Sequence, residues 1–341
     1  MKLQILRAGI VCSIIALSIS CGKPKLNVAP NPDTNTADAI ETMWMVHHIS
    51  DIEMVCAFIA EQDAYDNAYK PMAISGNGTM TPIFDIASKT LFQAYNQTKC
   101  TDNLLRDGTI NLNFKYQPDV FPRQTRNSVY MHEYGYAGQL TLSEYVVNGY
   151  RIKTHNGVPA LIINQLSSAD ADVSQVKLSW AIRGDFEIIH PQDAAKVMRM
   201  EVNLLKTLEN STNPSVYPKN GYIRWEDAIV SYSGVLKGTN FDGTAFTLTV
   251  SPEAPLVRDF NCVPDLSQGG VVASASPLRI NPGTFHPFVT GVAAYLPEGR
   301  YRREIYFGNE GDQRLSYQCD NKATVLIKGN LYTADLMPEV K

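Results

Sequence analysis

The sequence predicts a mainly β protein of antiparallel strands and hairpins, with one N-terminal helix. Three observations lead to this fold class. After residue 72, apolar and polar residues alternate in several runs, which is typical of half-buried strands. Asn148-Gly149 separates two such runs, a strong hairpin signal. The earlier segment 37–70 has helical spacing instead. We expect either a sandwich or a long twisted sheet with the helix on one face.

The first 20 residues have the layout of a signal peptide. Lys2 and Arg7 precede the mostly apolar run 8–19, which is shorter than the roughly 18 apolar residues that span a bilayer. Small residues then lead into Cys21, and this arrangement resembles a bacterial lipobox. The resemblance implies that Cys21 becomes the acylated first residue of the mature chain, and that its acyl chains hold the protein to a membrane.

The next two segments are predicted to be a tether and a helix. Residues 21–36 are rich in Pro, Asn and Lys, which is typical of a flexible linker. Segment 37–70 is expected to form an amphipathic helix that Pro71 ends, with either Thr36 or Asp38 supplying the N-cap oxygen. Its apolar stripe recurs at spacings of three and four: Met45, Ile49, Ile52, Cys56 and Ile59.

Region 72–341 is predicted to be antiparallel β structure. Residues 109–116, 176–182 and 246–250 alternate with period two, and Gly329-Asn330 indicates a second hairpin. Segment 194–209 has a helical composition, yet its apolar residues alternate with polar ones, so we expect a strand. A helix there would instead indicate a domain boundary near residue 210.

The C-terminal segment 319–332 reads C-D-N-K-A-T-V-L-I-K-G-N-L-Y. It resembles the ending C-D-N-x-A-x-V-x-I-x-G-x-x-Y of a group of uncharacterised lipoproteins from Bacteroidetes-type bacteria. The resemblance implies a β architecture and a place in the cell envelope, and it implies no chemistry. Cys262 and Cys319 both lie in this C-terminal part, at predicted strand edges, and on that basis we expect them to form a disulfide.

Composition and motifs exclude several function classes. The 30 Lys and Arg residues against 34 Asp and Glu leave no basic excess, so nucleic acid is not an expected partner. We find no G-x-S-x-G, P-loop or dinucleotide-binding glycine run in the sequence, and we assign no catalytic residue and no cofactor.

Three groups of polar residues are interpreted as structural, and no metal site is assigned. His47 and Asp51 are four residues apart on the predicted helix beside His48, without a third ligand in view, and fit the polar flank of an amphipathic helix. The pair Asp185 and Glu187 fits a solvated strand face. The third group has the residue types of turns: Asp102, Asn103, Asp107 and Gly108.

One aromatic segment is a candidate binding face. Its aromatic side chains alternate along an extended segment and would form a stacking platform for sugar rings if exposed, or part of the sheet core if buried: Tyr130, His132, Tyr134 and Tyr136. A second candidate is the group Tyr301, Arg302, Arg303 and Tyr306.

These observations together predict a lipid-anchored protein of the bacterial cell envelope, at the outer membrane. We expect a structural or interaction role without catalysis, with an envelope protein as partner. The alternative is a surface lipoprotein that binds a glycan or another ligand through the tyrosine-bearing strand.

Overall fold

The computed structural model describes residues 35–66, 78–85, 90–100, 102–114, 138–155, 159–165, 177–210, 228–259, 262, 264–265, 270–271, 285–308 and 317–337. Within them it confirms a mainly β fold with one N-terminal helix. Cys21 and the aromatic segment 130–136 lie outside the described residues. The elements, in chain order, are α1 (Ala37–Asp66), β1 (Thr79–Asp85), β2 (Thr90–Lys99), β3 (Leu105–Phe114), β4 (Gly138–Val147), β5 (Tyr150–Thr154), β6 (Leu161–Gln165), β7 (Lys177–His190), β8 (Asp193–Asn210), β9 (Ala228–Thr239), β10 (Ala245–Val250), β11 (Leu256–Asp259), β12 (Pro264–Asp265), β13 (Gly270–Val271), β14 (Phe288–Pro297), β15 (Arg303–Phe307), β16 (Lys322–Ile327) and β17 (Asn330–Asp335).

Among the described residues, 15 strands form one sheet, and β12 and β13 form a separate pair. Most strands pair antiparallel with the next strand along the chain, as expected for segments joined by hairpins. Two short strands share the space between β4 and β7, namely β5 and β6. In the same way β10 and β11 share the space between β9 and β14. The result is a long sheet with β7, β8 and β9 at its centre.

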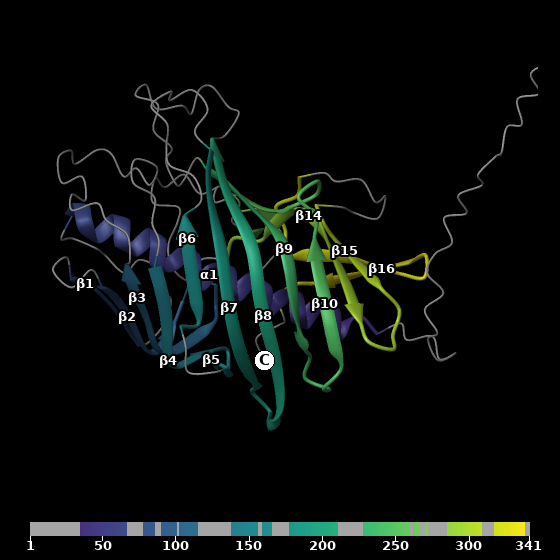
Figure 1. The fold of residues 1–341 in the computed structure, drawn as a ribbon, viewed down its shortest axis with the longest axis horizontal. Coiled ribbons are helices and arrows are strands. Elements are labelled where there is room, and N and C mark those ends of the chain that lie inside the picture. The colour runs from purple at the N-terminus through teal and green to yellow at the C-terminus, as the bar shows by residue number, and fades with distance from the viewer. Residues whose placement is uncertain are drawn as a thin grey trace, which may run out of the picture.

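The sheet lies over a single helix, so the second of the two expected architectures is the one observed. Figure 1 shows α1 running across the strands behind the sheet. Its first turn is paired with β15 through Asp38 and Arg303, and it also contacts β1, β2 and β3 at the other end of the sheet. No domain boundary interrupts the sheet near residue 210, because β8 and β9 pair from Arg199 with Thr239 to Asn210 with Ala228.

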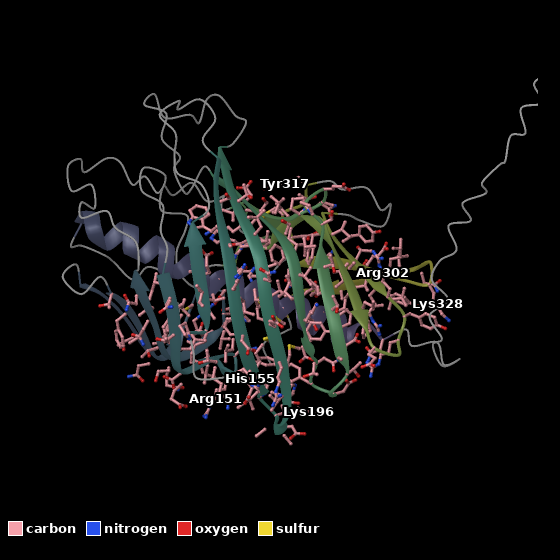
Figure 2. All side chains as sticks on the ribbon, viewed as in Figure 1. Arg151, His155, Lys196, Arg302, Tyr317 and Lys328 are labelled. Carbon is pink, nitrogen blue, oxygen red and sulfur yellow. A yellow bond between two sulfur atoms is a disulfide. The ribbon has the colours of Figure 1, made fainter. Side chains whose placement is uncertain are left out.

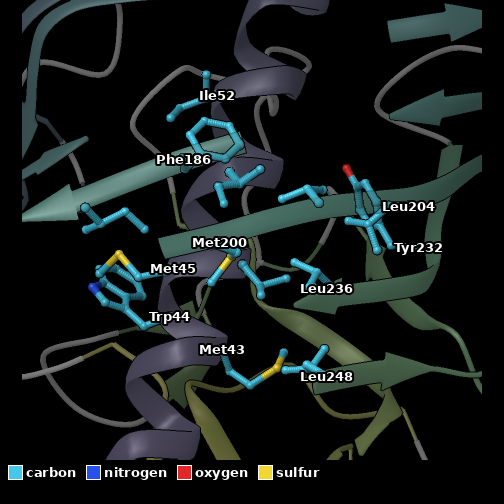
Figure 3. Packing of buried hydrophobic residues seen from close by; sticks show 14 of the residues in the cluster. Met43, Trp44, Met45, Ile52, Phe186, Met200, Leu204, Tyr232, Leu236 and Leu248 are labelled. Atoms are coloured by element: carbon cyan, nitrogen blue, oxygen red, sulfur yellow. The ribbon is translucent and has the colours of Figure 1, made fainter. Parts of the chain in front are cut away.

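The alternation predicted for 194–209 is confirmed, because β8 is a strand of 18 residues. Met198, Met200, Val202 and Leu204 are all buried, while the residues between them are exposed. Figure 3 shows how this inward face meets the helix, with Met200 and Leu236 of the sheet close to Met43, Trp44 and Met45 of α1. Period two therefore outweighed the helical composition of this segment, because one face of the strand is buried against α1.

The helix is confirmed, but its expected polar flank is wrong. Every residue from Thr42 to Ser50 is buried, on all sides of the helix. A helix with this burial is a core element and not a surface one. At its start, Asn35 Oδ1 accepts the Ala37 N–H at 2.9 Å, and Asp38 Oδ1 accepts the Ala39 N–H at 2.8 Å. Asn35 was not one of the two expected capping residues.

Both predicted hairpins are present, one with its turn at the predicted residues and the other with its turn shifted by one residue. Asn148 and Gly149, with φ of 48° and 83°, join β4 to β5 as predicted. In the C-terminal hairpin the positive angles fall one residue earlier than expected, at Lys328 (51°) and Gly329 (84°). Asn330 is therefore the first residue of β17. In the described part of the chain, no helix has both the length and the apolar character needed to cross a membrane.

Candidate functional site

The ionisable side chains of α1 face basic side chains of the sheet across the buried interface. Three pairs recur along the helix: Asp38 with Arg303 of β15, Asp51 with Arg258 of β11, and Glu53 with Lys206 of β8. The three basic residues are at most 1% exposed. Because buried charges are costly without partners, these pairs determine where the helix can lie on the sheet. We call this set of pairs the helix–sheet interface.

Glu53 and Lys206 form the most deeply buried of these pairs. Lys206 Nζ lies 2.8 and 3.0 Å from the two carboxylate oxygens of Glu53. The neighbouring strands supply Trp180 and Tyr232 at the positions directly opposite Lys206, and the Lys206 ammonium lies 4.9 Å from the Trp180 ring centroid. Burial raises the pKa of Glu53, and Lys206 offsets part of that rise.

Asp51 is held by a second buried base. Arg258 Nη2 donates to Asp51 Oδ1 at 2.5 Å, Nη1 donates to Ser50 Oγ at 3.0 Å, and Nε donates to the His286 carbonyl at 3.0 Å. Burial alone would raise the pKa of Asp51. The Arg258 guanidinium is the largest opposing influence, and the net effect holds that pKa far below its usual range. Arg258 thus joins the helix to the segment that leads into β14.

Three buried histidines surround this ion pair. His47 Nε2 donates to the His286 carbonyl at 2.9 Å, and its Nδ1 lies 3.3 Å from Asp51 Oδ2. His286 Nδ1 donates to the Cys262 carbonyl at 3.0 Å, and burial lowers the pKa of His286 to about 4. Burial also lowers the pKa of His48 well below its ordinary value. His47 and His48 are 0% and 1% exposed, so they are core residues and not the surface residues that the sequence suggested.

The structure shows that His48 lies close enough to His47 and Asp51 to be a third ligand. Ligand atoms of His47, His48 and Asp51 all lie within 4.8 Å of one another. Two histidines and one carboxylate are a ligand set that zinc accepts. The spacing of these residues in the sequence does not show that the side chains of both His47 and His48 can reach Asp51.

The expected disulfide between Cys262 and Cys319 is present, with Cα atoms 5.4 Å apart. It joins the segment after β11 to the segment before β16. Because the Cys262 carbonyl accepts from His286, the disulfide adjoins the same polar network that holds α1. The Tyr317 hydroxyl also donates to Asp259 Oδ2 at 2.8 Å across this junction.

The polar residues that the sequence assigned to a turn around residues 102–108 have structural partners. Arg106 donates to both carboxylate oxygens of Asp102, at 2.9 and 2.6 Å, and the Leu104 N–H also donates to Asp102. Asp107 accepts from the Gln97 side chain at 2.5 Å. Asp102 and Asn103 therefore lie in a turn, as interpreted, whereas the interpretation is wrong for Asp107 and Gly108, which belong to β3 at a shift in its register with β4.

The outer face of the sheet carries a hollow of about 430 Å³ between β6, β7 and β8. Arg183, Asp185, Glu201 and Asn203 contribute polar groups to it, and Asp185 lies directly opposite Glu201. Glu187 does not line this hollow, because it pairs with Lys153 at 2.7 Å and His155 at 3.3 Å. In the view of Figure 2, the labels of His155, Arg151 and Lys196 lie toward the end of the sheet where β7 turns into β8. Asp185 and Glu187 therefore occupy different surroundings.

The second candidate binding group, residues 301–306, does not form one continuous surface. Arg303 is buried against Asp38, whereas Arg302 is exposed and pairs with Glu304 at 3.2 Å. Tyr301 lies under the ammonium of Lys328, 3.7 Å from its ring centroid. Figure 2 places Arg302 and Lys328 toward the C-terminal end of the sheet.

Sequence reasoning missed the buried bases, although a signal for them exists. Each base lies two positions from a buried apolar residue of its own strand and so shares its inward face. The pairs are Leu204 and Lys206, Leu256 and Arg258, and Arg303 and Ile305. A charged residue in register with buried apolar residues indicates a buried charge that needs a partner.

The chain matches no protein-family model, no curated protein and no solved structure.

Proposed function

We propose that this protein is a lipid-anchored module of the bacterial cell envelope, attached to the outer membrane through acyl chains on Cys21, with a structural or interaction role. The observation that carries the proposal is the lipobox-like arrangement: basic Lys2 and Arg7, the apolar run 8–19, and small residues directly before Cys21. Residues 22–36 then provide a Pro-rich link of 15 residues between anchor and helix.

The way the chain enters the fold supports an anchored role. The carbonyl of Asn35 accepts from Arg303 Nη2 at 3.1 Å, and Asp38 pairs with Arg303 and with Arg300. The first described residues after the tether are therefore fastened to β15 and to the turn before it. A load on the tether would reach the sheet through these contacts before it reached the rest of the helix.

The use of buried charge supports a structural role. Asp38, Asp51 and Glu53 each face a base of the sheet, and these groups hold the helix to the fold. The outward face between β5 and β9 carries charges of both signs, such as Arg199 and Glu201, as on a solvated surface. A partner that binds there would be an envelope protein that recognises mixed charge.

The alternative function is a surface lipoprotein that binds a glycan. It rests on the alternation of Tyr130, His132, Tyr134 and Tyr136, and the outer hollow adds hydrogen-bonding groups of the kind that recognise sugar hydroxyls. Under this alternative, Tyr134→Ala abolishes binding on a glycan array while the far-ultraviolet circular dichroism is unchanged. Retained binding, or no binding by the unmodified protein, contradicts it.

Fatty-acid labelling of cells that express the protein tests the anchor. Cys21→Ala should abolish the label and move the protein from the membrane to the soluble fraction. Cys12→Ala is the matched control, because Cys12 lies inside the run 8–19 and should leave labelling unchanged. Labelling that survives Cys21→Ala would overturn the proposal.

Protease treatment of intact cells then separates the two functions. Digestion of the mature chain in intact cells places it on the surface and favours glycan binding. Protection until the outer envelope is broken favours the structural role, and cross-linking then identifies the envelope partner.

A further inference from the structure

The ring of His47 is in an unusual hydrogen-bonding situation. A backbone carbonyl only accepts, so the 2.9 Å contact with the His286 carbonyl requires the proton on Nε2 of His47. A neutral ring then carries a lone pair on Nδ1, and this atom lies 3.3 Å from the carboxylate oxygen Oδ2 of Asp51. Two acceptors therefore face each other in a buried place. Either a second ring proton or a metal cation resolves the contact.

His48 favours the cation. It is 1% exposed, and its Nε2 has no hydrogen-bond partner among the described residues. Its ligand atom belongs to the group that lies within 4.8 Å together with those of His47 and Asp51. We propose that His47, His48 and Asp51 form a binding site for a divalent transition-metal ion of the zinc class.

The geometry of the first two ligands matches zinc. Bonds of about 2.0–2.1 Å in tetrahedral geometry place ligand atoms about 3.3–3.4 Å apart. His47 Nδ1 and Asp51 Oδ2, at 3.3 Å, already have this separation. From the 4.8 Å limit, the His48 ligand atom would move by up to about 1.4 Å to reach the same separation. Asp51 is 18% exposed, so we expect a water molecule to serve as the fourth ligand.

The surroundings of the ligands have the hydrogen bonds that metal sites use. Metal-binding histidines usually donate their other ring N–H to a carbonyl or carboxylate, as His47 does to the His286 carbonyl. The second oxygen of Asp51 accepts from Arg258 at 2.5 Å, which orients the carboxylate.

The charge of Arg258 and the ligand types define the kind of ion. The guanidinium repels a cation bound to the same carboxylate and so weakens the site, but it leaves Oδ2 available. Imidazole nitrogens with one carboxylate suit zinc and its neighbours in the first transition row, whereas calcium and magnesium prefer oxygen ligands. The site should therefore bind Zn²⁺ in preference to Mg²⁺ and Ca²⁺.

Calorimetric titration of the purified full-length protein with Zn²⁺, after treatment with a chelator, tests the proposal. We expect one zinc ion per chain, confirmed by elemental analysis after dialysis. His47→Gln keeps a donor for the His286 carbonyl but removes the Nδ1 ligand, and His48→Gln removes the third ligand. Each should weaken zinc binding at least as much as the 10- to 100-fold loss typical of an outer-shell change.

His155→Gln is the matched control, because His155 lies on the outer face beside Glu187 and should leave zinc binding unchanged. Equal zinc binding by the unmodified protein and both cluster variants would overturn the proposal, and so would a lack of retained zinc.

A second measurement needs no substitution and decides the matter if the variants do not fold. Nitrogen-15 spectra of histidine-labelled protein should show the His47 Nδ1 signal move when Zn²⁺ is added. A ring with protons on both nitrogens that Zn²⁺ does not affect would overturn the proposal and identify the second ring proton as the bridging charge. Neither outcome depends on Cys21, so this test is separate from that of the membrane anchor.

Discussion

Replacing Lys206 by methionine should strongly destabilise the protein. The substitution keeps an unbranched side chain of similar length that can pack against Trp180, but it leaves the Glu53 carboxylate buried without its base. Removal of one member of a buried pair costs about 3–5 kcal/mol. We expect that loss in the free energy of unfolding near neutral pH, measured by urea denaturation followed through tryptophan fluorescence.

The loss should shrink in acid. Burial already raises the pKa of Glu53, and without Lys206 this pKa rises further. A carboxyl group whose folded pKa is raised stabilises the folded state below its unfolded pKa, and this contribution is lost as the pH rises through the folded pKa. The variant should therefore approach the stability of the unmodified protein as the pH falls towards about 4.5, the ordinary value for glutamate.

A double variant and an exposed control make the prediction specific. Glu53→Gln combined with Lys206→Met removes both charges, so it should cost less than Lys206→Met alone. Arg151→Met breaks the exposed pair with Glu144, whose side chains are 54% and 77% exposed, and should change stability by less than about 1 kcal/mol. The reasoning is refuted if Lys206→Met costs no more than Arg151→Met, or if the two interior substitutions are simply additive.

Three further predictions concern the disulfide, a buried tyrosine and one close strand contact. Replacing Cys262 and Cys319 by serine opens a loop of 57 residues, and denaturation in urea should show a loss of about 4 kcal/mol. Burial raises the pKa of Tyr295 to about 12, so stability should fall as the pH rises from about 10 towards 12, and Tyr295→Phe should lessen that fall in an alkaline titration. Gly234 has φ of +134°, and an added Cβ would meet the backbone of β8, so Gly234→Ala should cost about 2 kcal/mol or more in thermal unfolding. Gly243 is also at positive φ but has open space around it, so Gly243→Ala should cost only about 1 kcal/mol in the same assay.

Local patterns in the sequence were enough to predict several of the strands. The alternation in β3, β7, β8 and β10 depends only on which face of each strand is buried, and period two records that directly. The turn at Asn148-Gly149 was equally local, because these residue types accept positive φ. The C-terminal turn was placed one residue late, since Lys328 adopts a positive φ that its residue type does not predict.

The candidate site was less predictable than the fold. His47 and Asp51 were recognised as neighbours on a helix, but Arg258 lies 207 residues away in the chain. The apolar stripe through Met45, Ile49 and Ile52 suggested one buried face, and it gave no sign that the opposite face is buried too. Helical periodicity reports a contrast between faces, so a helix that is buried all round a turn gives a weak signal.

The sequence by itself determined the class of the fold, the N-terminal helix and several of the strands. These follow from periodicity and turn chemistry, which act between residues close in the chain. Only the tertiary structure decided which charges meet. Glu53 and Lys206 are 153 residues apart, and their contact exists because α1 crosses the sheet at one position. The same placement of α1 brings His47, His48 and Asp51 together and pairs Asp51 with Arg258. Each buried charge of the helix needs its partner in the sheet, so few other positions of the helix are possible.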